Sequence, residues 1–445
     1  MQNTYRNILS ELLRVPTIDT HEHLRFGHMI DFDVLREEAI EFTVDLRRII
    51  LGTYMAAPLA AAAAGEGLPG TDDRQSLLRA LRQCANTASY RCGVQIPFRD
   101  LYDFDIADLD ERSWNRVEAQ VVERYREGPW VWTREVFDRA AICRAIKINV
   151  SPSYYEQTLA SFSTRDRQIE EELFVGMGAT DMFILNKPDP TEQTTVQEGY
   201  GVLAEKYGVC LDDLEGFVAL IDRVLAHYRT LGACGVKSAA AYHRTLDIDF
   251  VTIEEARRLY RQPKQDLSNS QLKRFSDYCW IEVARAAGRH GLPFQIHTGL
   301  VQHKGHLLGD CNPALMRGLL NNSELSQTRF VLIHTGYPYA RESVHLAWDL
   351  PNVWIDFVWL PTLSIEAGAQ VLSEFLDWVP GNKFTLGGDF ELPEGVYGAM
   401  HQSREVLALA LARKVDQGFW SVDQALDLGR AILHDNARKL YNLNG

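Results

Sequence analysis

The chain has 445 residues, of which 46% are hydrophobic and 24% charged, and its formal net charge is −14. This is the balance of an ordinary globular protein, and its acidic surface disfavours nucleic acid and anionic membranes as partners. No apolar stretch reaches the roughly 18 residues that a membrane-spanning helix needs, and no signal peptide is expected from the first residues. The seven cysteines are scattered without a C-x-x-C pair. We therefore expect free thiols in a reducing cytoplasm.

The first predicted strand covers about residues 15–20 and ends at His21-Glu22-His23. Residues two apart on a strand point to the same face, so His21 and His23 can converge on one cation while Glu22 points away. Because short motifs also occur by chance, a pair of partly exposed histidines at a strand–loop junction is the alternative.

The segment that follows is long and helical in pattern. Helical periodicity runs through residues 33–50, 75–83 and 113–126, and residues 56–65 form an Ala-rich stretch. A single βα connection does not need this length. We interpret residues 25–135 as a helical insertion after the first strand.

Seven further strands are predicted, and helices such as those at about 211–231 and 270–290 separate them. The strands cover about residues 142–149, 181–186, 234–239, 291–296, 329–334, 353–357 and 383–388. Strands interleaved with helices indicate βα units and a parallel sheet. Eight such strands predict the α/β class and a closed (β/α)8 TIM barrel with a large helical insertion after strand 1.

Three of the later strands also end at a potential metal ligand, namely His297, His334 and Asp389. Functional side chains at the C-terminal ends of several strands are the layout of a TIM-barrel active site. In such a barrel the insertion lies on the active-site face, where it forms a lid or a substrate wall. A dimerisation element is the alternative for this segment.

This set of residues resembles the amidohydrolase superfamily, which carries His-X-His on strand 1 and further ligands after strands 5, 6 and 8. Its amidohydrolase-related branch includes decarboxylases and the amidohydrolase-like domain fused to glutamine-synthetase-like proteins. The segments similar to that branch are Gly235–Tyr242, Gln295–Gly299, Leu332–Pro338 and Ile432–Tyr441. The resemblance covers residues 14–24 and 140–445 well and residues 25–135 weakly. We therefore expect residues 1–24 and 136–445 to form the catalytic barrel, with 25–135 inserted in the same domain.

The resemblance implies a mononuclear metal site made by His21, His23, His297 and Asp389, with room for a water. Imidazole and carboxylate ligands suit Zn²⁺, and Mn²⁺ or Fe²⁺ are alternatives. The metal would lower the pKa of the water toward neutrality. Asp389 would also accept the proton of that water, as its family counterpart does, or it is a helix N-cap.

His334 and Lys237 decide how many metals the site holds. In two-metal members of the superfamily the counterpart of His334 binds the second ion, and in one-metal members it is an acid or a substrate clamp. A buried histidine satisfied by the backbone is the alternative. Lys237 is either a carboxylated bridge between two metals or a free lysine that pairs with an acidic substrate. The decarboxylase branch typically lacks the bridge, which favours one metal.

Two further residues are candidates for substrate binding. Arg341 is suited to a bidentate contact with a substrate carboxylate, and a structural salt bridge is its alternative. Trp359, after the seventh strand, either lines the pocket or packs in the core.

The ligand set favours metal-dependent hydrolysis of an amide or ester-like bond in a small polar substrate, because it leaves a place for water beside Asp389. Non-oxidative decarboxylation is the first alternative. The long insertion is also similar to that of uronate isomerases, a third chemistry. A non-catalytic barrel would be expected to lack the ligands. We expect a small-molecule substrate and a homo-oligomer.

Overall fold

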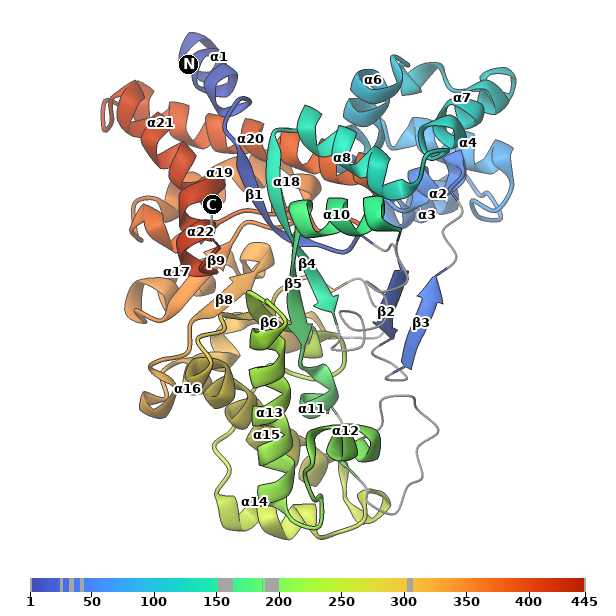
Figure 1. Cartoon of the computed structure of the whole chain (residues 1–445). Coiled ribbons are helices and arrows are strands. Elements are labelled where there is room, and N and C mark those ends of the chain that lie inside the picture. Colours follow the sequence, from blue (N-terminus) through green and yellow to red (C-terminus); the bar gives the residue numbers. More distant parts are fainter. Residues whose placement is uncertain are drawn as a thin grey trace.

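The computed structural model describes residues 2–24, 27–31, 36–40, 44–150, 163–185, 187–188, 200–301 and 307–443. Eight parallel strands form one sheet in the order β1-β4-β5-β6-β7-β8-β9-β10 (Figure 1). Their bounds are β1 Thr17–Glu22, β4 Ile142–Val150, β5 Phe174–Ala179, β6 Gly235–Ser238, β7 Phe294–His297, β8 Phe330–Ile333, β9 Val353–Asp356 and β10 Phe384–Thr385.

Backbone hydrogen bonds close the sheet between its last and first strands. The Thr20 amide donates to the Leu386 carbonyl oxygen at 3.2 Å, and the Asp389 amide donates to the His21 carbonyl oxygen at 2.8 Å. These bonds join β1 to the segment that follows β10. The predicted (β/α)8 TIM barrel is therefore confirmed.

Apolar side chains fill the interior of the barrel and also pack between its strands and the surrounding helices. One cluster joins Ile146 of β4, Met177 of β5 and Val331 of β8 with Tyr441 near the C-terminus. Because β6 and β7 separate β5 from β8 in the sheet, Met177 and Val331 can share a cluster only inside the barrel. A larger cluster packs the outer faces of the strands against the helices. The filling holds the strand ends, and therefore the site, at fixed separations.

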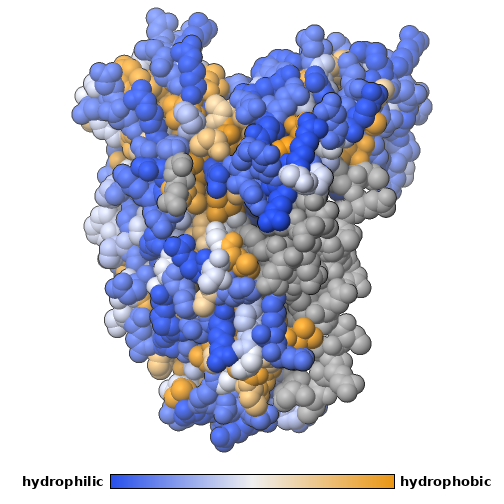
Figure 2. Space-filling model, in the orientation of Figure 1, coloured by the Kyte–Doolittle hydropathy of each residue, from blue (hydrophilic) through white to orange (hydrophobic). Residues whose placement is uncertain are grey.

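Helices alternate with the strands and cover the barrel. The predicted helices at 211–231 and 270–290 are α13 and α15. The main covering helices are α10 Thr164–Leu173, α13 Leu214–Thr230, α15 Asn269–Arg289, α17 Ala340–Asp349, α19 Ile365–Phe375 and α20 Pro393–Asp416. None of the helices in the described part of the chain is long and apolar enough to cross a membrane. The face seen in Figure 2 is mostly hydrophilic, with scattered hydrophobic residues.

The predicted strand at 181–186 is wrong for residues 181–185, and residue 186 lies outside the described residues. Asp181–Leu185 forms a short helix, α11, and the third barrel strand is β5, Phe174–Ala179. The glycines of β5 weaken its strand pattern, but packing requires one of them, because a Cβ atom on Gly178 would lie 2.6 Å from the ring of Tyr228. A short apolar run such as Met182–Leu185 does not by itself distinguish a strand from a helix.

The segment between β1 and β4 contains helices with their own apolar core. They are α2 Leu46–Leu51, α3 Ala56–Gly65, α4 Arg74–Gln83, α5 Ala88–Tyr90, α6 Ile96–Tyr102, α7 Glu111–Arg124 and α8 Pro129–Arg139. Before them, β2 Gly27–Asp31 pairs antiparallel with β3 Arg36–Ile40. The helical pattern expected over 33–50 is therefore wrong for residues 36–40. In Figure 1 most of these helices lie beside the upper part of the barrel, while β4 and β5 point downward.

Candidate metal centre

Two histidines and one carboxylate meet at the C-terminal ends of β1 and β10. The Nε2 atoms of His21 and His23 lie 3.4 and 3.3 Å from Oδ1 of Asp389. One possible ligand atom from each of the three residues lies within 4.8 Å of the others. His21 and Asp389 are buried, and His23 is half-buried. Imidazole nitrogen and carboxylate oxygen in this proximity are a donor set suited to Zn²⁺ and related transition metals.

A buried acidic pair joins β1 to the loop that carries Asp389. Asp19 accepts a hydrogen bond from the Gly388 amide at 3.1 Å, and Glu22 accepts one from the Phe390 amide at 2.7 Å. A Cβ atom on Gly388 would lie 2.2 Å from Glu22 Oε1, so any side chain at this position would displace the Glu22 carboxylate. Burial raises the pKa of Asp19 to about 6, and burial together with the Asp19 charge raises the pKa of Glu22 well above its usual value. The residues directly before and after Asp389 are thus both hydrogen-bonded to β1, which fixes the position of Asp389.

Gln295 of β7 fixes the tautomer of His21. Its Nε2 donates to the Thr20 carbonyl oxygen at 3.0 Å and to the Tyr441 hydroxyl at 2.8 Å. Its Oε1 therefore faces His21 Nδ1, 2.8 Å away, and accepts a hydrogen bond from it. His21 Nε2 keeps its lone pair and is buried without a hydrogen-bond partner. Burial, with a contribution from Lys237, holds the pKa of His21 well below its usual value. A neutral imidazole with a free, oriented lone pair fits a metal ligand.

His297 and His334 form a hydrogen-bonded chain next to this cluster. His297 Nε2 lies 2.8 Å from the Leu300 carbonyl oxygen and must donate to it. Its Nδ1 is therefore an acceptor, and His334 Nε2 donates to it at 3.0 Å. His334 Nδ1 is left with a lone pair, 3.9 Å from Asp389 Oδ2. Burial lowers the pKa of His334 and keeps it neutral. The structure thus places His297, our expected fourth ligand, against His334 rather than in the three-residue group.

Strained backbone is concentrated around the cluster. Among the described residues other than glycine, eight have a positive φ, and five of these lie at the centre: Tyr54, His334, Thr335, Trp359 and Asp389. A positive φ is unfavourable for residues with a Cβ atom and persists only where surrounding contacts impose it. Such outliers gather at functional sites, which supports the location of the centre.

Lys237, at the end of β6, is 2% exposed. Burial lowers its pKa to about 8, and the charges of Asp389 and Asp181 oppose this shift. The β-sheet register places Lys237 next to Gln295, the partner of His21. The structure therefore puts a buried amine close to the cluster.

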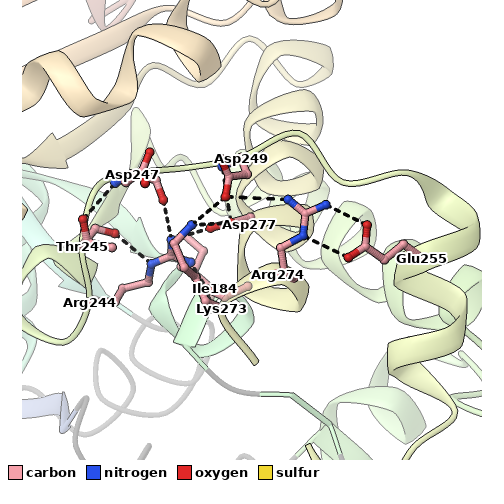
Figure 3. A network of polar contacts seen from close by, with 10 residues as sticks. Ile184, Arg244, Thr245, Asp247, Asp249, Glu255, Lys273, Arg274 and Asp277 are labelled. Atoms are coloured by element: carbon pink, nitrogen blue, oxygen red, sulfur yellow. Dashed lines mark hydrogen bonds and ion pairs between the residues drawn. The ribbon is translucent and has the colours of Figure 1, made fainter. Parts of the chain in front are cut away.

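The loop after β6 brings Tyr242 to the site. The ring centroids of Tyr242 and His297 are 4.6 Å apart. Further along, Arg244 donates to buried Asp277 of α15, which also accepts from Lys273 at 2.8 Å, and Lys273 reaches Asp249 at 3.2 Å (Figure 3). This network fastens the loop to α15 and fixes one wall of the centre.

Trp359 and Tyr54 form another wall. The Trp359 ring lies 5.3 Å from that of His334 and 4.9 Å from that of Tyr54. The Tyr54 hydroxyl interacts with the Asp389 carboxylate, and burial together with the Asp389 charge raises the pKa of Tyr54 well above its usual value. Tyr54 belongs to the segment between β1 and β4, and no motif marks it in the sequence.

Arg341 is not part of the site. It is the second residue of α17, and its guanidinium, 77% exposed, pairs with Glu374 at 3.0 Å. The helix turns its side chain outward, so the structure supports the salt-bridge interpretation of this residue rather than substrate binding.

Comparison with known proteins adds a family match and several similar structures. Residues 194–443 match the family model described as amidohydrolase. The chain is 29% identical over 242 residues to Protein fluG of Emericella nidulans, and the match covers 51% of this chain and 27% of fluG. The chain thus matches about a quarter of the length of that relative.

Three solved structures share its architecture over almost the whole chain. A uronate isomerase from Thermotoga maritima has a TM-score of 0.74 at 13% identity, covering 99% of this chain and 97% of its own. A glucuronate isomerase from Caulobacter crescentus has a TM-score of 0.68 at 17% identity, with 100% and 95% covered. A protein described as a metal-dependent hydrolase from Lactobacillus casei has a TM-score of 0.64 at 18% identity, with 98% and 97% covered. At these identities the likeness concerns the fold alone.

Proposed function

The chain belongs to the amidohydrolase family, and from this premise we propose that it is a metal-dependent hydrolase that cleaves an amide or ester-like bond of a small polar substrate. The position of Asp389 carries the proposal. One of its oxygens lies within 3.4 Å of Nε2 of His21 and His23, and the other lies 3.9 Å from Nδ1 of His334. A carboxylate between a ligand pair and a neutral imidazole is suited to take up a proton and pass it on.

His21, His23 and Asp389 would hold one divalent transition metal, with Zn²⁺ preferred and Mn²⁺ or Fe²⁺ as alternatives. Their fit to a metal rests on the buried, partnerless Nε2 of His21 and the tautomer that Gln295 imposes. A bound ion supplies Lewis acidity and lowers the pKa of water toward neutrality. His297 would become a fourth ligand only by giving up one of its two hydrogen bonds.

The side chains would then carry the proton between water and leaving group. Asp389 accepts a proton from the attacking water through its carboxylate. His334 Nδ1, whose lone pair faces Asp389 Oδ2, receives this proton and delivers it to the leaving group. The hydrogen bond from His334 Nε2 to His297 fixes the ring in the tautomer that this transfer requires.

Two groups would orient the substrate. Lys237 pairs with an acidic group of the substrate, because it is a buried amine beside the cluster, and we propose that it is not carboxylated. Trp359 presents an aromatic wall against His334. Lys237 lies on β6, and Trp359 directly precedes the short helix Leu360–Leu363, so neither side chain depends on a long free loop for its position.

The test is turnover in ¹⁸O-labelled water with a panel of small amides, esters and lactones that carry a carboxylate. We expect solvent oxygen in the product and loss of turnover in Asp389→Asn. Release of CO₂ with a solvent proton on carbon would instead show a decarboxylase. Isomerisation of a sugar acid without incorporation of oxygen would show an isomerase. Either outcome would overturn the proposed hydrolysis.

A further inference from the structure

Tyr54 reaches the metal centre from outside the barrel, and its neighbour Thr53 holds its backbone. Thr53 is fully buried, and its hydroxyl donates to the Ile50 carbonyl oxygen at 3.2 Å. A Cβ atom on Gly93 would come within 2.6 Å of Thr53 Oγ1 and 2.7 Å of Thr53 O. Thr53 therefore fits its position only because residue 93 has no side chain, and Tyr54 follows it with a φ of 60°.

Gly93 lies at the middle of a π-helical turn, Arg91–Gln95. The Ile96 amide donates to the Arg91 carbonyl oxygen across this turn. A π-turn is rare because it widens the helix by one residue, and it is frequent at functional sites. In this π-turn, the residue that faces Thr53 is Gly93, which has no side chain.

The same segment also supports the loop that carries Trp359. Ser89 of α5, just before the turn, donates from Oγ to the Thr362 carbonyl oxygen at 3.3 Å, and Cys92 Sγ donates to Thr362 Oγ1 at 3.7 Å. Thr362 belongs to the short helix Leu360–Leu363, which begins directly after Trp359. The segment around the π-turn thus contacts both Thr53, which precedes Tyr54, and Thr362, which lies just after Trp359.

α20 of the barrel packs against the π-turn. A Cβ atom on Gly398 would lie 1.8 Å from the Cys92 carbonyl oxygen, so helix and turn are in direct backbone contact. Gln402, one turn later, donates to the carbonyl oxygens of Ala88 and Pro361 at 3.2 and 2.8 Å. α20 begins at Pro393, four residues after Asp389. The π-turn therefore packs against the helix that directly follows the metal ligand in the chain.

We propose that the π-turn Arg91–Gln95 is the common support that positions Tyr54 and Trp359 at the metal centre, and that Gly93 is the positioning residue for Tyr54. The turn acts on the centre through Thr53, which holds the Tyr54 ring against Trp359 and against Phe390, the residue next to Asp389. This inference rests on the proposed function only in taking His21, His23 and Asp389 as the metal site.

The experiment uses Co²⁺ as the probe and needs no substrate. The full chain is stripped of metal, and its Co²⁺ affinity and visible absorption spectrum are measured for the wild type, Tyr54→Phe, Gly93→Ala and the double variant. Loss of a partner of a metal ligand typically weakens metal binding by about 10–100-fold. We expect this loss in Tyr54→Phe, a loss of similar size and the same spectral change in Gly93→Ala, and no further loss in the double variant.

Gly65→Ala is the matched control, because it adds the same methyl group to the same segment where a Cβ atom meets nothing within 4 Å. Gly65→Ala should bind Co²⁺ like the wild type. If Gly93→Ala fails to fold, as judged by circular dichroism, Thr53→Ala takes its place. It opens the contact from the other side and should shift the spectrum in the same direction.

The outcomes separate this inference from the proposed function. If the wild type binds Co²⁺ but Gly93→Ala and Thr53→Ala match the wild type, the support role is wrong and the metal centre stands. Additive losses in the double variant, or wild-type affinity in Tyr54→Phe, would equally overturn the inference. A wild-type chain that binds no Co²⁺ would overturn the metal centre and the inference with it.

Discussion

Asp389 follows β10 with a φ of 72°, and this left-handed backbone turns its two carboxylate oxygens toward different partners. Oδ1 faces His21 and His23 at the end of β1, and Oδ2 faces His334. The carboxylate can therefore serve as a ligand and as a proton acceptor at once.

We predict that Asp389→Asn lowers kcat by about two to four orders of magnitude, the range expected for a lost general base. An amide retains an oxygen ligand but is a poor proton acceptor. Metal content should therefore fall less than in His21→Ala. The measurement is steady-state kinetics with metal analysis of the same sample, and near-normal turnover would exclude the role.

Gln295 offers a second test at the residue scale. Gln295→Leu removes the acceptor that holds His21 in one tautomer, so we expect metal affinity to fall by about 10–100-fold. Titration calorimetry with Zn²⁺ measures this loss. Gln327→Leu makes the same substitution at an exposed position. It is the control and should bind Zn²⁺ like the wild type. Equal affinities for both variants would show that Gln295 has no influence on the ligand.

The sequence identifies those site residues that stand at strand ends. His21, His23 and Asp389 each follow an apolar run, and the barrel brings such positions together. Tyr54 could not be found in this way, because its role depends on a backbone turn between two helices. For Arg341 the sequence shows only a position after His334, which left substrate binding and a salt bridge open; at the start of α17 its exposed side chain pairs with Glu374.

At the scale of elements, the barrel strands were predictable where uninterrupted apolar runs ended at turn residues. β5 was missed because its glycines interrupt the pattern. β10 contains only Phe384–Thr385, since the chain then leaves the sheet and bonds to β1 through Leu386 and Asp389. Such local changes depend on contacts between distant strands, which a single sequence does not display.

Asp356, at the end of β9, makes stability depend on pH. It is buried and accepts hydrogen bonds from the hydroxyls of Thr20 and Thr385 at 2.5 and 2.7 Å. Burial raises its pKa from 3.8 to about 6. The folded state therefore keeps a proton that the unfolded chain releases between these values. Protonated Asp356 therefore stabilises the folded state below about pH 4, and this stabilisation is lost as the pH rises through 6. The loss lowers the unfolding free energy by about 3 kcal/mol.

Asp356→Asn removes this titration and keeps the shape of the side chain. We expect its unfolding free energy to fall less steeply than that of the wild type between pH 4 and pH 7. Some slope should remain, because burial also raises the pKa of Asp19 to about 6. Urea unfolding at four pH values measures both slopes. Identical slopes would contradict the titration of Asp356 in this range.

At the scale of the whole molecule, buried Glu394 of α20 joins the barrel to the helical segment before β4. Its Oε1 accepts from the Tyr102 hydroxyl at 2.6 Å and from Trp132 Nε1 at 2.8 Å, and its Oε2 accepts from the Tyr125 hydroxyl at 2.8 Å. Three aromatic donors from α6, α7–α8 and α8 thus end on one carboxylate. The segment has its own core, yet it is fixed to the barrel at this point.

We predict that Glu394→Leu lowers the unfolding free energy by at least about 3 kcal/mol, because each donor left unsatisfied costs about 1–3 kcal/mol. Glu394→Gln is the matched comparison, since it keeps an oxygen for Tyr102 and Trp132, and it should cost clearly less. Denaturant unfolding of both variants measures the difference. Equal losses would mean that packing, rather than these hydrogen bonds, joins the two parts.

Metal content measured by mass spectrometry tests the central claim most directly. The purified chain should carry close to one equivalent of a transition metal, and the double variant His21→Ala/His23→Ala should carry none while keeping the circular dichroism of the wild type. Full occupancy in that double variant would contradict the assignment of the centre. Two equivalents in the wild type, with extra crystallographic density on Lys237 Nζ, would contradict the single-metal account.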